Sequence, residues 1–327
     1  MARDTAPGVE WRVEETGAGQ RLDRFLSDPE RLGSRSRAAA ALDRGQVFLN
    51  GEERAGGDGA LRLAAGDRVR LWRDRPGSAS RHTRARSLAG FRIVFEDDAL
   101  IVVEKPAGLL TVPLPDAGAE PSVLDGLDAE YAARTRREPL VVHRIDRDTS
   151  GLVVFAKTGP ALARLRAQFA RREPERVYLA VVCGVPEPPA GTWSDWVWWN
   201  RRALVLQSAS RSQRGAVEAV CRYEVLESWR QAALIEVSLV TGRQNQIRAQ
   251  AMLHGHPLIG EQKYASDAVR GRPSFPRQAL HAHRLAFAHP LTGKPVEFES
   301  PLPRDLADLV ARLRREGDAR ARKAGPR

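Results

Sequence analysis

The sequence predicts an α+β protein made of a small α/β module and a larger, β-rich domain in which helices separate the strands. Three observations predict this organisation. The chain has 327 residues, which exceeds the roughly 100–200 residues typical of one domain. Apolar residues mark short helix-like segments in the first part of the chain and longer strand-like segments from Phe91 onward. Residues 74–90, between the two patterns, are rich in Pro, Gly, Ser and Arg, which is typical of a linker.

Residues 15–73 are expected to form the small module. Two short helices come first, with Ser34 or Ser36 available to cap the second one. Asn50 and Gly51 then form a tight-turn dipeptide at the end of a strand. The expected elements are helices at Arg21–Leu26 and Ser34–Arg44, followed by strands at Val47–Leu49 and Arg68–Trp72.

Residues 91–315 are expected to form the larger domain, and residues 316–327 a basic tail. Strand-like segments dominate this part of the chain. The expected strands are Arg92–Glu96, Leu100–Lys105, Leu140–His143, Gly151–Ala156, Arg176–Gly184, Gly215–Leu226, Ala232–Thr241, Ala279–Phe287 and Pro295–Glu299. Helices are expected around Leu162–Phe169, at Gly242–His254 and at Pro303–Arg315, where apolar residues share one face.

The chain is strongly basic. It carries 52 Lys and Arg against 41 Asp and Glu, which gives a formal net charge of +11 and a pI near 10.5. Such an excess favours a polyanionic partner over a neutral small molecule. Five of the cations are Lys and 47 are Arg, a ratio that suits bidentate phosphate contacts but could equally reflect genome composition.

The composition also excludes several classes of protein. No apolar run approaches the roughly 18 residues of a membrane span, and residues 1–15 lack the apolar core of a signal peptide. We therefore expect a cytoplasmic protein without membrane association. Cys183 and Cys221 are too few for a disulfide scaffold or a Cys-rich zinc site, and no HExxH motif is present.

The densest polar cluster in an apolar setting is the segment 141–151, VVHRIDRDTSG, which lies between two expected strands. A turn on a rigid scaffold can aim a carboxylate into a cleft, and neighbouring arginines favour its ionised form, which a nucleophile or general base requires. Asp146 is therefore a candidate catalytic residue. The alternative is that Asp146 and Asp148 only accept hydrogen bonds from turn amides while the arginines are solvated.

A second polar cluster, Thr241–Arg248, falls where a strand is followed by a helix. Its generic interpretation is an N-terminal cap. Positive charge at this end of a helix opposes the helix dipole, so Arg243 or Arg248 is expected to be held there by an anion, either a carboxylate or a phosphate.

Taken together, seven segments spread in order over nearly the whole chain resemble the RluA-type pseudouridine synthases, which isomerise uridine in RNA. The matching segments are Asp97–Gly108 (DDALIVVEKPAG), His143–Gly151 (HRIDRDTSG), Arg176–Gly184 (RVYLAVVCG), Thr241–Arg248, Gly255–Tyr264 (GHPLIGEQKY), Leu280–Ala282, and Phe287–Pro290 with Leu302 and Pro303. The resemblance implies the pseudouridine synthase fold, a mixed and mainly antiparallel β-sheet with flanking helices. The first module similarly resembles the small RNA-binding domain called the α-L motif.

The resemblance also implies a reaction. The uracil glycosidic bond breaks, the base rotates, and its carbon 5 joins the ribose without net hydrolysis. Asp146 matches the family's essential nucleophile, which either attacks the sugar or assists formation of an unsaturated sugar. Arg248 matches the arginine that pairs with this Asp, and Tyr178 matches a tyrosine that lies against the target base, although a tyrosine there could also simply pack within its strand. Arg144 is implied to help flip the uridine by occupying the space that the base leaves.

Substrate contacts are further implied for neighbouring residues of the same motifs, namely His143, Arg243, Gln246 and Ile247. One departure falls in the second cluster, because the family motif usually reads TGRTHQIR. Gln244 and Asn245 replace its Thr and His here. An Asn can still donate and accept hydrogen bonds, so the local substrate contacts are the part of the resemblance that this change affects.

Two further segments carry an open or purely structural interpretation. Lys105, Pro106 and Gly108 are interpreted as a rigid strand exit, because Pro and Gly explain that geometry without chemistry. Residues Trp193–Trp199 hold four tryptophans, with Arg201 and Arg202 close behind. Alternation along this stretch fits a strand packed in the core, whereas aromatic rings beside arginines also fit a platform for single-stranded RNA.

The residues and the resemblance together predict a monomeric RNA pseudouridine synthase that requires no organic cofactor and no metal. The expected partner is RNA, with large-subunit ribosomal RNA favoured by analogy with family members that carry the leading module. One alternative is a non-catalytic RNA-binding or ribosome-assembly factor that has kept the fold. Another is a metal-dependent phosphodiesterase with His143, Asp146 and Asp148 as ligands.

Overall fold

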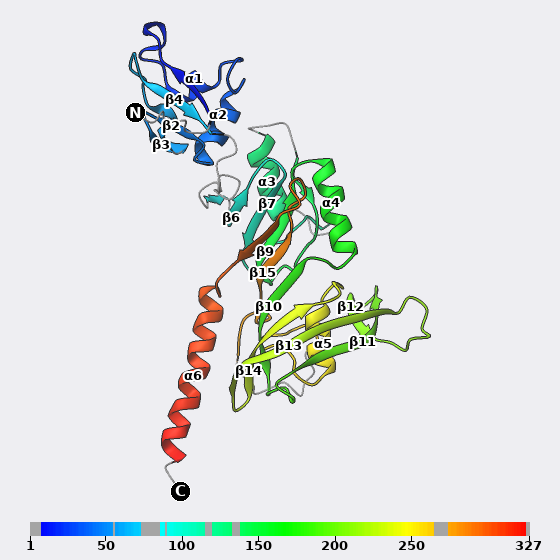
Figure 1. Cartoon of the computed structure of the whole chain (residues 1–327). Coiled ribbons are helices and arrows are strands. Elements are labelled where there is room, and N and C mark those ends of the chain that lie inside the picture. Colours follow the sequence, from blue (N-terminus) through cyan, green and yellow to red (C-terminus); the bar gives the residue numbers. More distant parts are fainter. Residues whose placement is uncertain are drawn as a thin grey trace. The chain divides into compact units, whose positions relative to one another are not determined.

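The computed structural model describes residues 8–54, 56–72, 86–88, 90–114, 120–132, 138–264 and 274–324. The chain divides into two compact units between Arg86 and Ser87, with Phe95–Asp97 grouped with the first unit. In Figure 1 the first unit is blue, and the second runs from cyan to red. Most of the predicted linker, residues 74–90, lies outside the described residues.

The first unit is a four-stranded antiparallel sheet with two α-helices. Its elements are β1 (Val9–Arg12), α1 (Leu22–Leu26), α2 (Arg35–Asp43), β2 (Val47–Leu49), β3 (Glu52–Arg54) and β4 (Arg68–Leu71), with short 3-10 helices at Glu15–Gly17 and Gly56–Ala60. The strand order is β1-β4-β2-β3. Leu22, Phe25 and Leu42 pack with Val69 in its core. Strand β1 precedes residue 15, so the sheet extends beyond the predicted start of the module.

Local sequence signals explain the helix start and the turn in this unit. Ser34 caps α2, because its hydroxyl accepts the Arg37 backbone N–H at 3.2 Å. Asn50 adopts a left-handed conformation with φ of 54°, as the turn between β2 and β3 requires. Both features agree with the sequence prediction.

The second unit contains a twelve-stranded sheet. Its strands are β5 (Arg86–Leu88), β6 (Phe91–Glu96), β7 (Leu100–Lys105), β8 (Leu140–Val141), β9 (Ser150–Ala156), β10 (Glu175–Cys183), β11 (Ala190–Asn200), β12 (Val205–Ser208), β13 (Val217–Trp229), β14 (Ala232–Leu239), β15 (Leu280–Ala288) and β16 (Pro295–Glu299). The order is β12-β11-β13-β14-β10-β15-β9-β7-β6-β5, with β16 on β15 and β8 on β9. Strands β9 and β15 pair in parallel, whereas β10 pairs antiparallel with both β14 and β15. This mainly antiparallel α+β architecture confirms the predicted fold class.

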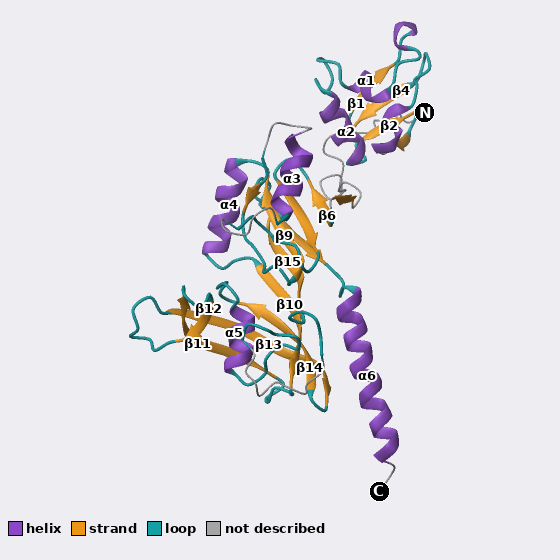
Figure 2. Cartoon of the chain, turned by 180° about the vertical axis from the view of Figure 1, so that it is seen from behind, coloured by secondary structure: helices purple, strands orange, loops and turns teal. Residues whose placement is uncertain are grey.

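Helices cover both faces of this sheet, and the central strand β10 shows why. Tyr178, Ala180 and Val182 face one core cluster, and the alternate residues Leu179 and Val181 face another. The helices are α3 (Val123–Ala132), α4 (Gly159–Ala170), α5 (Gln246–Leu253) and α6 (Arg304–Ala324). The first half of α6 packs on the second cluster. Figure 2 shows α5 beside β11 and β13, where Ala249 packs in a further apolar cluster.

Several boundaries differ from the sequence prediction. Helix α5 begins at Gln246 rather than Gly242, because Asn245 has a φ of 55° and its left-handed backbone cannot continue a helix. Helix α6 continues to Ala324, so residues 316–324 of the predicted tail are helical, which fits their content of Ala, Arg and Lys. Helix α3 and strands β1, β3, β5 and β12 were not predicted, and β5 lies within the segment that was expected to be a linker. Among the described residues, no helix has the length and apolar character that crossing a membrane requires.

A glycine at the end of the polar turn generates a test of the fold. Gly151 has a φ of +114° where β9 meets β15, and a Cβ atom there would overlap the carbonyl oxygen of Ala282. We expect Gly151→Ala to lower the free energy of unfolding by about 3 kcal/mol or more, because it adds both backbone strain and a steric clash. Gly293 has a φ of +71° with open space around it, so Gly293→Ala should cost only about 1 kcal/mol. Equal losses in chemical denaturation would contradict the clash.

Candidate active site

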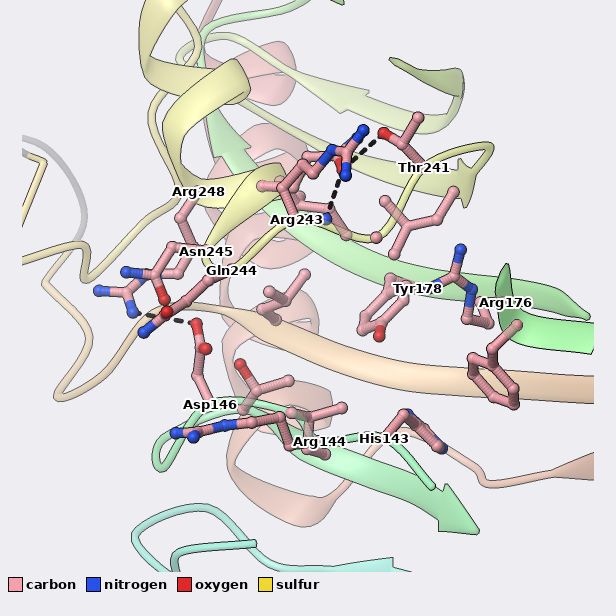
Figure 3. Close-up of a pocket in the computed structure, with 18 of the residues that line it drawn as sticks. His143, Arg144, Asp146, Arg176, Tyr178, Thr241, Arg243, Gln244, Asn245 and Arg248 are labelled. Atoms are coloured by element: carbon pink, nitrogen blue, oxygen red, sulfur yellow. Dashed lines mark hydrogen bonds and ion pairs between the residues drawn. The ribbon is translucent and has the colours of Figure 1, made fainter. Parts of the chain in front are cut away.

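A pocket of about 590 Å³ lies where segments of the second unit that are distant in the sequence meet. It is lined by the turn that follows β8, by the end of α4, by strand β10, by the loop and first residues of α5, and by the first residue of β15 (Figure 3). The pocket brings together every residue that the sequence analysis singled out as catalytic or substrate-binding. These are His143, Arg144, Asp146, Tyr178, Arg243, Gln246, Ile247 and Arg248.

Asp146 and Arg248 form an ion pair in this pocket. Arg248 Nη1 donates to Asp146 Oδ2 at 3.1 Å, as the dashed line in Figure 3 shows. The Asp146 side chain remains 24% exposed, whereas that of Arg248 is only 11% exposed. A carboxylate that is accessible from the pocket is therefore held by a guanidinium that is largely buried.

Glu261 holds the other side of the Arg248 guanidinium. Arg248 Nε donates to Glu261 Oε2 at 2.8 Å and Nη2 donates to Oε1 at 2.7 Å, and the Glu261 side chain is fully buried. Burial opposes the charge of Arg248, but hydrogen bonds and charges from Glu261 and Asp146 outweigh it and raise the arginine's pKa. Glu261 lies in one of the segments that resemble the family, but this contact was not predicted from the sequence, because Arg248 lies thirteen residues away.

The backbone of the turn that carries Asp146 is held by side chains from outside the turn. Thr111 Oγ1 donates to the Ile145 carbonyl at 2.8 Å, and Arg277 Nη1 donates to the Asp148 carbonyl at 3.0 Å. Lys105 Nζ donates to the Arg147 carbonyl at 2.6 Å. Carbonyls that are bonded to these largely buried side chains leave the turn little freedom to move.

Lys105 has a larger role than the strand exit that its sequence context suggested. Its side chain is buried, and besides the turn its ammonium donates to the carbonyls of Pro106 at 2.8 Å and Leu109 at 2.6 Å. Burial lowers the pKa of Lys105 to about 7, and the charges of Asp148 and Asp146 act in the opposite direction. Three carbonyl acceptors match the three N–H groups of a lysine ammonium.

Tyr178 and three arginines supply much of the pocket surface. Burial raises the pKa of Tyr178 to about 12, so its phenol is neutral at physiological pH. Arg144 is exposed, and Arg243 is partly exposed while its Nε donates to the Glu218 carbonyl at 3.0 Å. Arg176 lies over the ring of Phe169, with 5.7 Å from its guanidinium carbon to the ring centroid. The pocket thus combines a neutral aromatic ring with a positive rim.

Gln246 lines the pocket, but the protein occupies its whole amide. Its Oε1 accepts from Thr241 Oγ1 at 2.7 Å and from the Arg243 N–H at 2.9 Å. Its Nε2 donates to the Val220 carbonyl at 3.1 Å and to Gln250 Oε1 at 3.0 Å. In this arrangement Gln246 supports the loop before α5 and has no hydrogen-bonding capacity left for a substrate. Ile247, next to it, is buried and packs in the main core cluster.

His143 is likewise engaged by the protein. Its Nε2 accepts the Val154 backbone N–H at 3.1 Å, and its ring stacks on Phe169 with a centroid separation of 4.8 Å. Burial lowers the pKa of His143 to about 3, with a smaller effect from the charge of Arg176. The imidazole is therefore neutral, and it secures the entry into the turn.

The tryptophan stretch forms strand β11, in agreement with its alternating pattern. Trp193 is buried against Tyr223 and His254, with ring centroids 4.7 Å and 5.3 Å away. Trp196 and Trp199 are only partly buried, and cations lie over both rings. Trp193 is therefore a core residue, whereas Trp196 and Trp199 are only partly packed in the protein.

Metal-ligating side chains do not gather in the described part of the chain. Across those residues, no group of three or more His, Cys, Asp or Glu side chains is arranged to hold a metal ion. His281 and His283 are two residues apart on β15, and both place a ring nitrogen on the Ser300 carbonyl, at 3.0 Å and 2.7 Å.

Comparison with known proteins identifies the family. Residues 99–253 match the family described as RNA pseudouridylate synthase. The chain is 34% identical to ribosomal large subunit pseudouridine synthase D of Zymomonas mobilis, over 94% of this chain and 98% of that protein. It is 33% identical to an uncharacterized RNA pseudouridine synthase of Bacillus subtilis, over 94% of this chain and 99% of that protein. The chain belongs to the RNA pseudouridine synthase family.

The fold agrees with this assignment. The solved structure of human RNA pseudouridylate synthase domain containing 4 has a TM-score of 0.56, with 24% identity over 68% of this chain and 92% of that one. As an RluA-type RNA pseudouridine synthase, the protein is an isomerase. The family match spans Asp146, Tyr178 and Arg248, whereas Glu261 lies beyond its end.

The neutral state of His143 predicts how the stability of the synthase depends on pH. An unfolded histidine takes up a proton near pH 6.5, whereas the folded chain resists protonation until about pH 3. The free energy of unfolding should therefore fall as the pH drops from 6.5 toward 3, by up to about 1.4 kcal/mol per pH unit from this group. His143→Gln keeps an acceptor for the Val154 N–H but does not titrate. Denaturation between pH 6.5 and 4 should show a shallower slope for this variant, and equal slopes would contradict the prediction.

Proposed function

We propose that this enzyme isomerises specific uridines in structured RNA, with Asp146 as the nucleophile acting on a uridine that has been flipped out of its helix. The observation that carries the proposal is the accessible Asp146 carboxylate held by Arg248. Two relatives are named ribosomal large subunit pseudouridine synthases, of type D in Zymomonas mobilis and type C in Vibrio vulnificus. We therefore propose large-subunit ribosomal RNA as the target, modified in the cytoplasm by a monomer.

The site chemistry fits an isomerisation. When the glycosidic bond breaks, positive charge develops on the sugar, and a single ionised carboxylate can either trap the sugar or assist its conversion to an unsaturated form. Asp146 is the one acid among the described residues that line the pocket. A glycosidase commonly uses a second carboxylate to activate water, and the pocket lining supplies none. The free base then remains to rejoin the sugar through carbon 5.

The electrostatics of the pocket fit an RNA substrate. Five of its described lining residues are arginines, namely Arg144, Arg172, Arg176, Arg243 and Arg248. Arg248 is already paired with two carboxylates, and the others surround the opening with positive charge that can contact phosphate groups. The first unit would add sequence-independent contacts to the RNA backbone, as an α-L module is expected to do.

A flipped uridine follows from the position of the carboxylate. The sugar of a stacked and paired nucleotide cannot enter a pocket of this kind, so the target nucleotide must leave its helix. We propose that Arg144, which is exposed beside the turn, occupies the space that the base leaves, and that Tyr178 packs against the flipped base. Loops and bulges are the favoured targets, because extrusion costs least there.

Asp146→Asn tests the nucleophile with little change of shape. We expect release of tritium from carbon 5 of labelled uracil in RNA to fall by at least about a thousandfold, because an amide cannot act as the anionic nucleophile. Asp148→Asn, in the same turn, is the matched control and should keep most of the turnover. Activity of the wild type should also survive EDTA. Undiminished release by Asp146→Asn would overturn the assignment.

Mapping of pseudouridines in total RNA tests the substrate. Cells that lack the protein should lose pseudouridine at one or a few defined positions of large-subunit ribosomal RNA. Pseudouridine at those positions should return when the wild-type gene is supplied, but not when the Asp146→Asn gene is supplied. Loss confined to another RNA would overturn the proposed target, and no loss at any position would favour the non-catalytic RNA-binding factor.

A further inference from the structure

Asn245 is a largely buried polar residue of the pocket lining. It is 8% exposed, lies directly before α5, and lines the pocket between Asp146 and Tyr264. Figure 3 shows its side chain beside Asp146 and Arg248. Its left-handed backbone, with φ of 55° and ψ of 22°, is one that Asn tolerates better than most residues.

The neighbours of the Asn245 amide decide which way it faces. An amide oxygen facing Asp146 would set acceptor against acceptor, so the nitrogen belongs on that side. It then donates to both Asp146 oxygens, at 2.9 Å to Oδ2 and 3.0 Å to Oδ1. The amide oxygen, in turn, accepts from Tyr264 Oη at 3.2 Å.

Tyr264 fixes this orientation. Its Oη accepts the Leu206 backbone N–H of strand β12 at 2.8 Å, which leaves the hydroxyl proton free to be donated to Asn245. Its ring lies under the Arg248 guanidinium, with 5.6 Å between the guanidinium carbon and the ring centroid. Its backbone N–H donates to Glu261 Oε1 at 3.2 Å. Tyr264 therefore contacts both Arg248 and Asn245, the two residues that donate hydrogen bonds to Asp146.

We propose that Asn245 is a positioning residue for the reaction, which holds the Asp146 carboxylate in one rotation through its amide nitrogen while Tyr264 keeps the amide from turning over. Arg248 Nη1 contacts only Oδ2, so it cannot by itself prevent rotation about the bond to the carboxyl group. The Asn245 nitrogen contacts both oxygens and supplies that constraint. This inference rests on the proposed role of Asp146 as the nucleophile.

The variant Asn245→Gly removes the side-chain amide without disturbing the left-handed backbone, so it isolates the effect of the amide. Gly adopts the left-handed conformation freely, so the variant should fold, keep its melting temperature and bind RNA with unchanged Kd. We expect its single-turnover rate to fall by about tenfold to a hundredfold, because the reacting carboxylate loses two charge-assisted hydrogen bonds. Asn245→Asp keeps the shape but sets one carboxylate against another, so its rate should fall at least as far.

Asn50→Gly is the matched control. Asn50 has nearly the same φ, and its amide also bonds to a carboxylate, Asp67 at 2.8 Å, but it lies in the first unit. Its single-turnover rate with saturating enzyme should equal that of the wild type. A wild-type rate in Asn245→Gly or Asn245→Asp would overturn the positioning role.

A double-mutant cycle tests the part played by Tyr264. Tyr264→Phe should slow the single-turnover rate by a few-fold, and Asn245→Gly with Tyr264→Phe should be no slower than Asn245→Gly alone, because the tyrosine acts through the amide. Multiplied losses of rate in the double variant would overturn this coupling.

The result for Asp146→Asn distinguishes failure of the proposed nucleophile from failure of the positioning inference. If that variant keeps its activity, the proposed nucleophile fails, whereas if it is inactive and Asn245→Gly is not, only the positioning inference fails.

Discussion

The ion pair between Asp146 and Arg248 is the interaction on which the site depends. A guanidinium that is largely buried requires compensation, and Arg248 receives it from two carboxylates of different kinds. Glu261 takes the Nε and Nη2 donors and is closed to solvent, which leaves Nη1 directed at Asp146. The fully buried acid therefore stabilises the charge of Arg248 and orients its guanidinium, while the carboxylate of Asp146 stays accessible from the pocket.

The second constraint is the rigidity of the turn that carries Asp146. Its carbonyls are bonded to Lys105, Thr111 and Arg277, which come from segments before and after it in the chain. His143 closes the near end of the turn, and Gly151 allows the far end to approach β15 closely. A surface turn would exchange such bonds with water, whereas this one is fixed by side chains from outside the turn, so the Asp146 carboxylate is carried on a rigid support.

Short segments of the sequence were enough to predict the family and to select residues that line one pocket. The turn with Asp146, the loop with Arg248 and the strand with Tyr178 could each be recognised, because family motifs are local strings of residues. Glu261, Asn245 and Lys105 were present in the same strings, yet their contacts with the site were not predicted. Those contacts depend on residues that are distant in the chain or on the orientation of an amide, and neither can be predicted from spacing.

The sequence by itself determined the α+β class, the positions of most strands and the choice of Asp146 as the candidate nucleophile, because periodicity and motif depend on neighbours along the chain. Only the tertiary structure decided that segments spread over residues 143–280 share one pocket, and that a buried Glu261 directs Arg248. It also decided that α5 begins at Gln246, where a left-handed Asn245 turns its amide toward Asp146. Charges and hydrogen bonds act between residues that are close in space, and the packing of the sheet brings these residues close together although they are distant in the sequence.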